Sequence, residues 1–143
     1  MLKSKKAISP ILATLLLIVI VVAAIVVAYT WIMTYMGSTT SQAGVLLSKD
    51  NVEWLTGPPK QIRLYVRNTG TSDAIISSVY IGTSATNLAN ATIASMKPTN
   101  GVVAANGGVA QITITYTWTS GTTYYFRVAP KVGAPLEFNI KAP

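Results

Sequence analysis

The stretch from Ile11 to Met36, ILATLLLIVIVVAAIVVAYTWIMTYM, decides the fold because it is apolar almost without interruption. Its only polar side chains are three threonines and the ring tips of Tyr29, Trp31 and Tyr35. No charged residue lies between Lys6 and Lys49. Strands in globular domains do not reach this length. The stretch therefore predicts one long helix that requires apolar surroundings on every side.

The flanking residues give the boundaries of this helix. Ser9 and Pro10 are typical of a first turn, where serine caps free N–H groups and the missing N–H of proline costs nothing. Gly37 is typical of a helix end, and the polar sequence after it predicts a flexible linker. We therefore expect a basic segment over 1–7, a hydrophobic helix over 8–37, a linker over 38–44 and a second domain over 45–143.

Three interpretations of this basic start and long apolar run can be compared. A cleaved secretory signal has an apolar core of about 7–15 residues, so this run is too long for one. A membrane span needs about 20 apolar residues, and a helix over 8–36 would measure roughly 43 Å against a hydrocarbon layer of about 30 Å. Its N-terminal lysines would remain cytoplasmic, which places the second domain outside the cell. A bundle of identical helices would suit the same side chains.

The residues KKAISPILATLLLIVIVVAAIVVAYTWIM, Lys5 to Met33, resemble the N-terminus of archaeal type IV pilins and, more loosely, of archaeal flagellins. In that family a prepilin peptidase removes a short basic leader at the cytoplasmic face, and the hydrophobic helix is retained. The resemblance implies that Lys5 and Lys6 are the recognised charges, that Ala7 precedes the cut and that Ile8 becomes the new N-terminus. Bacterial type IV pilins usually have a Glu where this chain has Leu12, so helices here would pack through apolar contacts alone.

The same resemblance implies an extracellular filament built from many copies of the chain. The subunit would first be inserted in the cytoplasmic membrane and would then join a homo-oligomeric helical filament at the cell surface. A prepilin peptidase, an assembly ATPase and a platform membrane protein would be its partners. The residues expected in the filament core are Ile11, Leu15, Ile18, Val22, Ile25, Val26 and Tyr29.

Beyond the linker the apolar pattern changes to the two-residue period of β-strands. In KQIRLYVRN the residues Ile62, Leu64 and Val66 share an inner face. The other inward positions are Ala110, Ile112, Ile114, Tyr116 and Trp118, then Tyr124, Phe126 and Val128, and then Leu136, Phe138 and Ile140. About six to eight short strands at this spacing predict an immunoglobulin-like β-sandwich. The whole chain is thus α+β in class, with the helix first and an all-β domain second.

The composition excludes several classes of function. Because the chain has no Cys and no His, it has no thiol nucleophile, no disulfide framework and no Cys- or His-based metal site. The net charge is +7, but the basic residues of the second domain are scattered, so we expect no nucleic-acid partner. Asp50 and Glu53 are expected in a solvated turn ahead of a strand rather than as an acid–base pair. We expect no enzyme activity, no cofactor and no metal.

Two features of the second domain allow a carbohydrate interpretation. Asn90-Ala91-Thr92 is an N-glycosylation sequon, which makes Asn90 a candidate site on an exported glycoprotein. The aromatic residues between Tyr116 and Phe126 could form a sugar-binding platform, but their alternation favours packing in the core. Outward threonines are ordinary at exposed strand positions.

These observations favour a structural subunit of a type IV pilus that serves in surface adhesion. Two alternatives stay open at this point. The first is a single-span membrane protein that displays its β domain as an extracellular binding module. The second is a flagellin-like subunit of an archaeal motility filament.

Overall fold

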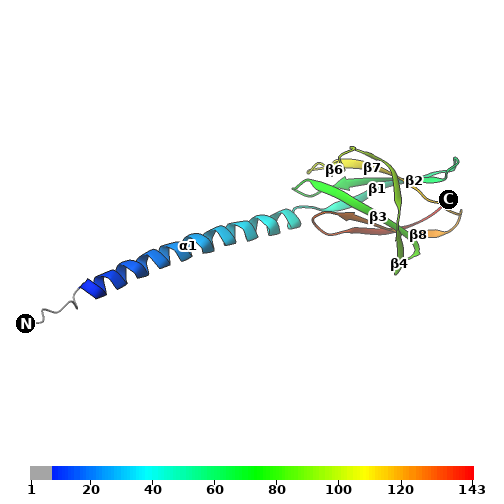
Figure 1. Cartoon of the computed structure of the whole chain (residues 1–143). Helices are drawn as coiled ribbons and strands as arrows, with labels where there is room; N and C mark the ends of the chain where they lie inside the picture. The colour runs from blue at the N-terminus through cyan, green and yellow to red at the C-terminus, as the bar shows by residue number, and fades with distance from the viewer. Residues whose placement is uncertain (1–7) are drawn as a thin grey trace, which may run out of the picture. The chain divides into compact units, whose positions relative to one another are not determined.

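A computed structural model shows one long helix followed by a β domain (Figure 1). The structure describes residues 8–143, with side chains described for 10–37 and 44–143. The chain divides between Thr39 and Thr40 into two compact units. The predicted α+β class, a long apolar helix followed by an all-β sandwich, is confirmed.

The helix α1, Ile8–Ala43, continues beyond its predicted end. Gly37 lies inside it, and the polar residues from Ser38 to Ala43 keep the helical backbone. The expectation that Gly37 ends the helix was therefore wrong. A glycine inside a helix costs about 1 kcal/mol relative to alanine. Once a helix exists, each added residue gains a backbone hydrogen bond without a new nucleation cost, so one glycine does not stop it.

Nine strands follow α1 within the described residues, and they form two antiparallel sheets. One sheet has the order β1-β2-β7-β5 and the other the order β4-β3-β8-β9, with the short β6 paired to β3. The strands are β1 (Leu47–Leu55), β2 (Gln61–Asn68), β3 (Ala74–Ser84), β4 (Asn87–Asn90), β5 (Thr92–Lys97), β6 (Val102–Val103), β7 (Gly108–Thr115), β8 (Thr123–Pro130) and β9 (Leu136–Lys141).

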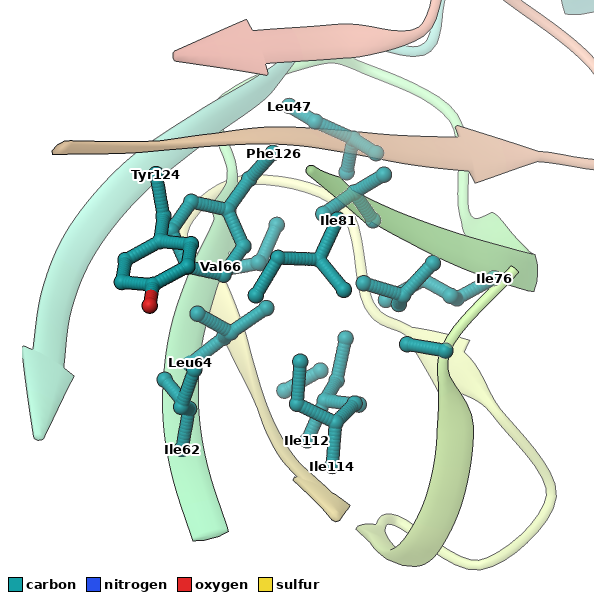
Figure 2. Close-up of a cluster of buried hydrophobic side chains, with 14 of the residues drawn as sticks. Leu47, Ile62, Leu64, Val66, Ile76, Ile81, Ile112, Ile114, Tyr124 and Phe126 are labelled. Carbon is teal, nitrogen blue, oxygen red and sulfur yellow. The ribbon is translucent and has the colours of Figure 1, made fainter. Parts of the chain in front are cut away.

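The core lies between the two sheets and is built mainly from the inward faces of β2, β3, β7 and β8 (Figure 2). In β2 the predicted alternation is confirmed, because Ile62, Leu64 and Val66 are completely buried while the residues between them are partly exposed. In β7, Ile112 and Ile114 are likewise completely buried. The predicted inward residues of β8 and Trp118 are also buried. The predicted residues of β9 and Tyr116 are only partly buried, and they pack against the edge of the core.

Two sequence-based expectations about polar residues differ from the structure. Asp50 and Glu53 lie inside β1 and not in a turn ahead of a strand. Thr113 was expected on an exposed face, but it is buried, and its register partners on β2 and β5 are Arg63 and Ser95. A threonine in a central strand is flanked on both sides by neighbouring strands, and the long Arg63 side chain beside it can cover the exposed face.

The β domain has a joint end, at which the chain enters the domain from α1, and a distal end. At the joint end Gly44 and Leu46 accept backbone hydrogen bonds from Ser72 (3.0 Å) and Thr69 (2.8 Å). A Cβ on Gly70 would lie 2.0 Å from the carbonyl oxygen of Gly44, so the two segments touch backbone to backbone. The first residues of the domain are therefore held firmly by the loop between β2 and β3.

Candidate functional site

Exposed apolar side chains cover α1 on every side. The seven residues expected in a filament core are between 54% and 61% exposed. The segment Pro10–Gly37 contains an 18-residue stretch with a mean hydropathy of 3.4, and none of that stretch is buried. By length and composition this segment suits a membrane, another helix or both in succession.

The threonines of α1 satisfy their own hydroxyl groups. Thr14 donates to the carbonyl of Ile11 (2.8 Å) and Thr34 donates to the carbonyl of Thr30 (2.9 Å). Thr30 donates to the carbonyl of Val27 (2.9 Å). Moving a hydroxyl group from water into apolar surroundings without a hydrogen-bond partner costs roughly 2–7 kcal/mol, depending on the reference state. The helix can therefore be enclosed in lipid or in other helices without leaving these three donors unpaired.

The expected core residues and a cluster of three alanines lie on opposite sides of α1. The seven expected core residues follow a spacing of three and four, which places them along one stripe of the helix. A shallow notch lies on the other side, and it is lined by Ala23, Ala24, Val27, Ala28 and Trp31. At about 100° per residue this notch is roughly half a turn away from the stripe. One helix thus offers protruding side chains on one face and a recess on the opposite face.

Three arginines and three carboxylates of the β domain form ion pairs. Glu53 accepts a hydrogen bond from Arg63 (2.8 Å), and Arg67 and Arg127 donate to Asp50 (2.9 Å) and Glu137 (2.7 Å). The pKa of the Arg63 guanidinium is raised above its ordinary value, first by the hydrogen bond to Glu53 and then by that to Tyr65. Asp50 and Glu53 thus serve two separate ion pairs, and no acid–base dyad forms between them. Among the described residues no group of three or more metal-ligating side chains gathers.

The comparisons with known proteins concern the fold. No protein-family model and no curated protein sequence matches this chain. The archaeal flagellum of Methanospirillum hungatei strain JF1 is similar in structure, with a TM-score of 0.63 and 16% identity over 98% of this chain and 94% of that chain. The chain has an archaeal type IV pilin-like fold. The archaellum periplasmic stator protein FlaG from Sulfolobus acidocaldarius is also similar, with a TM-score of 0.54 and 18% identity over 67% of this chain and 99% of that chain.

In this pilin-like chain the expected processing site falls at the start of α1. Lys5, Lys6 and Ala7 lie outside the described residues. Ile8, the expected mature N-terminus, is the first residue of α1. A cut between Ala7 and Ile8 would therefore leave the whole helix in the mature subunit.

Asn90 lies where the pilin-like domain passes from one sheet to the other. It ends β4, and Thr92 begins β5. Both side chains are exposed, whereas Ala91 between them is buried and donates its N–H to the carbonyl of Val79 (2.8 Å). The sequon is thus accessible to modifying enzymes, although its middle residue is fixed.

The aromatic residues of the pilin-like domain mainly fill its core. Trp118 and Tyr124 are buried, and both rings lie against Trp54 at centroid distances of 5.2 and 5.7 Å. The Lys60 ammonium lies 4.7 Å from the Trp118 ring centroid and donates to the Trp118 carbonyl. This arrangement confirms core packing over a sugar-binding platform.

Sequence reasoning missed a cleft at the joint end of the domain. We call it the joint cleft, and its volume is about 290 Å³. It is lined by Val45, Ser72, Asp73, Ile75, Lys131 and Val132. These residues come from three separate segments, so no local pattern indicates that they meet.

Proposed function

We propose that the chain is the structural subunit of an extracellular type IV pilus filament. Copies of α1 form the core of this filament, and the β domains form its outer surface. The observation that carries the proposal is the exposure of α1 along the whole of Pro10–Gly37. Exposing a large apolar side chain to water costs about 1.5–3 kcal/mol. Outside the membrane, only other helices of the same kind can cover this many apolar side chains.

The helix α1 is surrounded by lipid before assembly and by other helices in the filament. In the bilayer, an apolar helix gains little from meeting another helix, because lipid tails are as apolar as its own side chains. The newly made subunit is therefore stable as a single span, with its β domain outside the cell. After a prepilin peptidase has cut between Ala7 and Ile8, an assembly ATPase and a platform membrane protein supply the work of extraction.

The two faces of α1 favour open-ended assembly over a closed dimer. Packing the bulky stripe of one copy into the alanine notch of the next uses two different surfaces. Such heterologous contacts leave one free surface at each end, so they generate rings or helical filaments. Small residues also let helix backbones approach closely, which increases van der Waals contact in the absence of charges.

Surface adhesion is the role we propose for the pilus, and motility is the second candidate. One similar structure is an archaeal flagellum, which favours a rotating filament as the alternative. A deletion strain separates the two roles. Loss of attachment to surfaces with normal swimming supports adhesion, whereas loss of swimming supports motility.

The test of the filament itself begins with shearing of whole cells. Fibres in the sheared fraction that contain this chain support the proposal, and chains confined to the membrane pellet would instead indicate a single-span anchored module. Peptide mass spectrometry of the fibres then identifies the N-terminus. Chains that begin at Ile8 support the proposed cut, and chains that begin at Met1 contradict it. The same spectra show whether Asn90 carries a glycan, as we propose for its exposed sequon.

A further inference from the structure

The exposed apolar side chains of the β domain gather at its joint end. Among the described residues from Gly44 onward, the exposed large hydrophobic side chains are Leu46, Ile75, Val109 and Val132. Ile75 and Val132 line the joint cleft, and Leu46 directly follows Val45, which also lines the cleft. Val109 is paired to Arg67, next to the end of β2. Within the described residues, the distal end and both outer faces away from the joint lack such side chains.

The joint cleft combines apolar walls with one cation. Val45, Ile75 and Val132 supply the walls, and Ile75 and Val132 are 39% and 43% exposed. Lys131 and Asp73 also line it. Asp73 accepts the backbone N–H of Ala105 (2.8 Å). Lys131 forms no ion pair among the described residues, although Asp73 lines the same cleft. A flat aromatic ring matches this environment, since its face attracts a cation and its body fills an apolar recess.

We propose that the joint cleft binds Trp31 of a second copy of this chain in the filament. Trp31 is 68% exposed on α1, the largest value among the large hydrophobic side chains of the described residues. A neighbouring helix brings no charge, because none lies between Lys6 and Lys49, so Lys131 meets a ring and not another cation. The inference rests on the proposed filament and names a contact that helps to fix the stagger of its subunits.

Helix geometry gives the stagger that this contact requires. Thirteen positions separate Trp31 from Gly44 (44 − 31), which corresponds to about 20 Å along a helix. Two parallel copies displaced by about this distance bring Trp31 of one beside the joint end of the other. Lipid is the less suitable occupant, because a lipid tail offers Lys131 no aromatic ring.

Photo-crosslinking in assembled filaments tests the contact. A chain carrying photo-reactive benzoylphenylalanine at position 132 (Val132→benzoylphenylalanine) is assembled in cells, sheared, irradiated and digested with chymotrypsin. Trypsin is unsuitable because it cannot cut between Lys6 and Lys49. We expect a two-chain product whose crosslinked peptide comes from α1 and includes Trp31. The matched control places the same probe at Thr119, an exposed residue in the loop between β7 and β8, and should give no α1 adduct.

Every result of this experiment supports or overturns the contact. The α1 adduct should fall several-fold in Trp31→Ala filaments and persist in Trp31→Phe filaments. Adducts to lipid or to another β domain, or intact filaments without an adduct, overturn the inference while the filament function stands. Absence of filaments from the unsubstituted chain overturns both. If the probe at position 132 prevents assembly, the same probe at Ile75 is judged by the same criteria. Because the chain has no cysteine, a disulfide between Trp31→Cys and Val132→Cys copies provides an independent measurement.

Discussion

Asn68 connects three segments at the joint end through one buried side chain. Its amide nitrogen donates to the carbonyls of Ser72 (2.8 Å) and Val103 (3.1 Å), and its amide oxygen accepts the N–H of Gly70 (3.0 Å). The side chain is 0% exposed, so water cannot replace these partners. Because the Gly70 loop holds the first residues of the domain, this asparagine fixes the place at which α1 is attached.

Replacing Asn68 should destabilise the domain strongly. Asn68→Ala leaves two carbonyls and one N–H without partners in the interior, and we expect a loss of about 2–4 kcal/mol. Chemical unfolding of the full chain in detergent micelles, followed by tryptophan fluorescence, measures this loss. Asn139→Ala on the exposed side of β9 is the matched control, and it should change stability by less than about 0.5 kcal/mol. Equal effects of the two substitutions would contradict this role of Asn68.

The role of Asn68 could not be predicted from the sequence. Asn68 begins NTGTSD, a cluster of turn-forming residues, and that cluster indicates only that the chain reverses. Its partner Val103 lies 35 positions away, and no periodic pattern links them. Buried polar networks depend on tertiary contacts, so the sequence predicts the turn but not the side-chain hydrogen bonds of Asn68 that hold it.

At the scale of elements, the central strands were predictable and several edge strands were not. β2 and β8 are covered on both sides by neighbours, so their inward residues are consistently apolar and the alternation is clear. β1 and β5 are sheet edges, and about half of the residues in their sequences LSKDNVEWL and TIASMK are polar. An edge strand with charges and irregular pairing avoids association with other sheets. That requirement weakens the pattern from which a strand is predicted.

Weak ion pairs join the edge strands β1 and β9 to their neighbours, and we expect acid to have little effect on the filament. Arginines on β2 and β8 bind carboxylates on β1 and β9 in three partly exposed pairs. Such pairs contribute about 0–1 kcal/mol each. The pKa of Arg63 is raised above its ordinary value by the hydrogen bond to Glu53, so the arginine keeps its charge at acid and neutral pH. The contribution of that raised pKa to stability is lost only as the pH rises through it.

Electron microscopy of sheared fibres after incubation at about pH 2 measures this acid resistance. We expect intact fibres of unchanged diameter, because the apolar core contains no group that titrates in acid. Fibres kept at neutral pH provide the reference. Release of subunits in acid, detected by sedimentation, would show that carboxylates carry more of the assembly than the structure indicates.

The notch of α1 gives a second prediction at the scale of elements. Ala28→Phe fills the recess with an apolar side chain, so membrane insertion should persist while filament yield falls at least several-fold. Val19→Phe is the matched control, because Val19 lies outside both the notch and the bulky stripe and gains less volume. Immunoblots of the sheared and membrane fractions measure both quantities. Unchanged fibre yield with Ala28→Phe would exclude the notch from the core contacts.

At the scale of the whole molecule, assembly and charge are separated. The helix α1 carries no charged side chain, and the described ion pairs all lie in the β domain. We expect fibres to remain assembled in about 1 M sodium chloride, where charges more than about 3 Å apart are screened. A detergent that supplies apolar surroundings should release subunits instead. Sedimentation before and after each treatment measures both effects, and dissociation by salt alone would show that charges hold the fibre together.

The inward-bonded threonines of α1 bear on how a subunit moves between its two surroundings. Thr14 and Thr34 donate to carbonyls of their own helix, so turning or sliding α1 past its neighbours breaks none of these bonds. The energy profile for that motion should lack the deep local minima that interhelical polar bonds would create. In the proposed filament, a subunit can then rotate and advance without breaking a polar bond to its neighbours. Its final azimuth is selected by the fit of surfaces, and not by bonds that must first be broken.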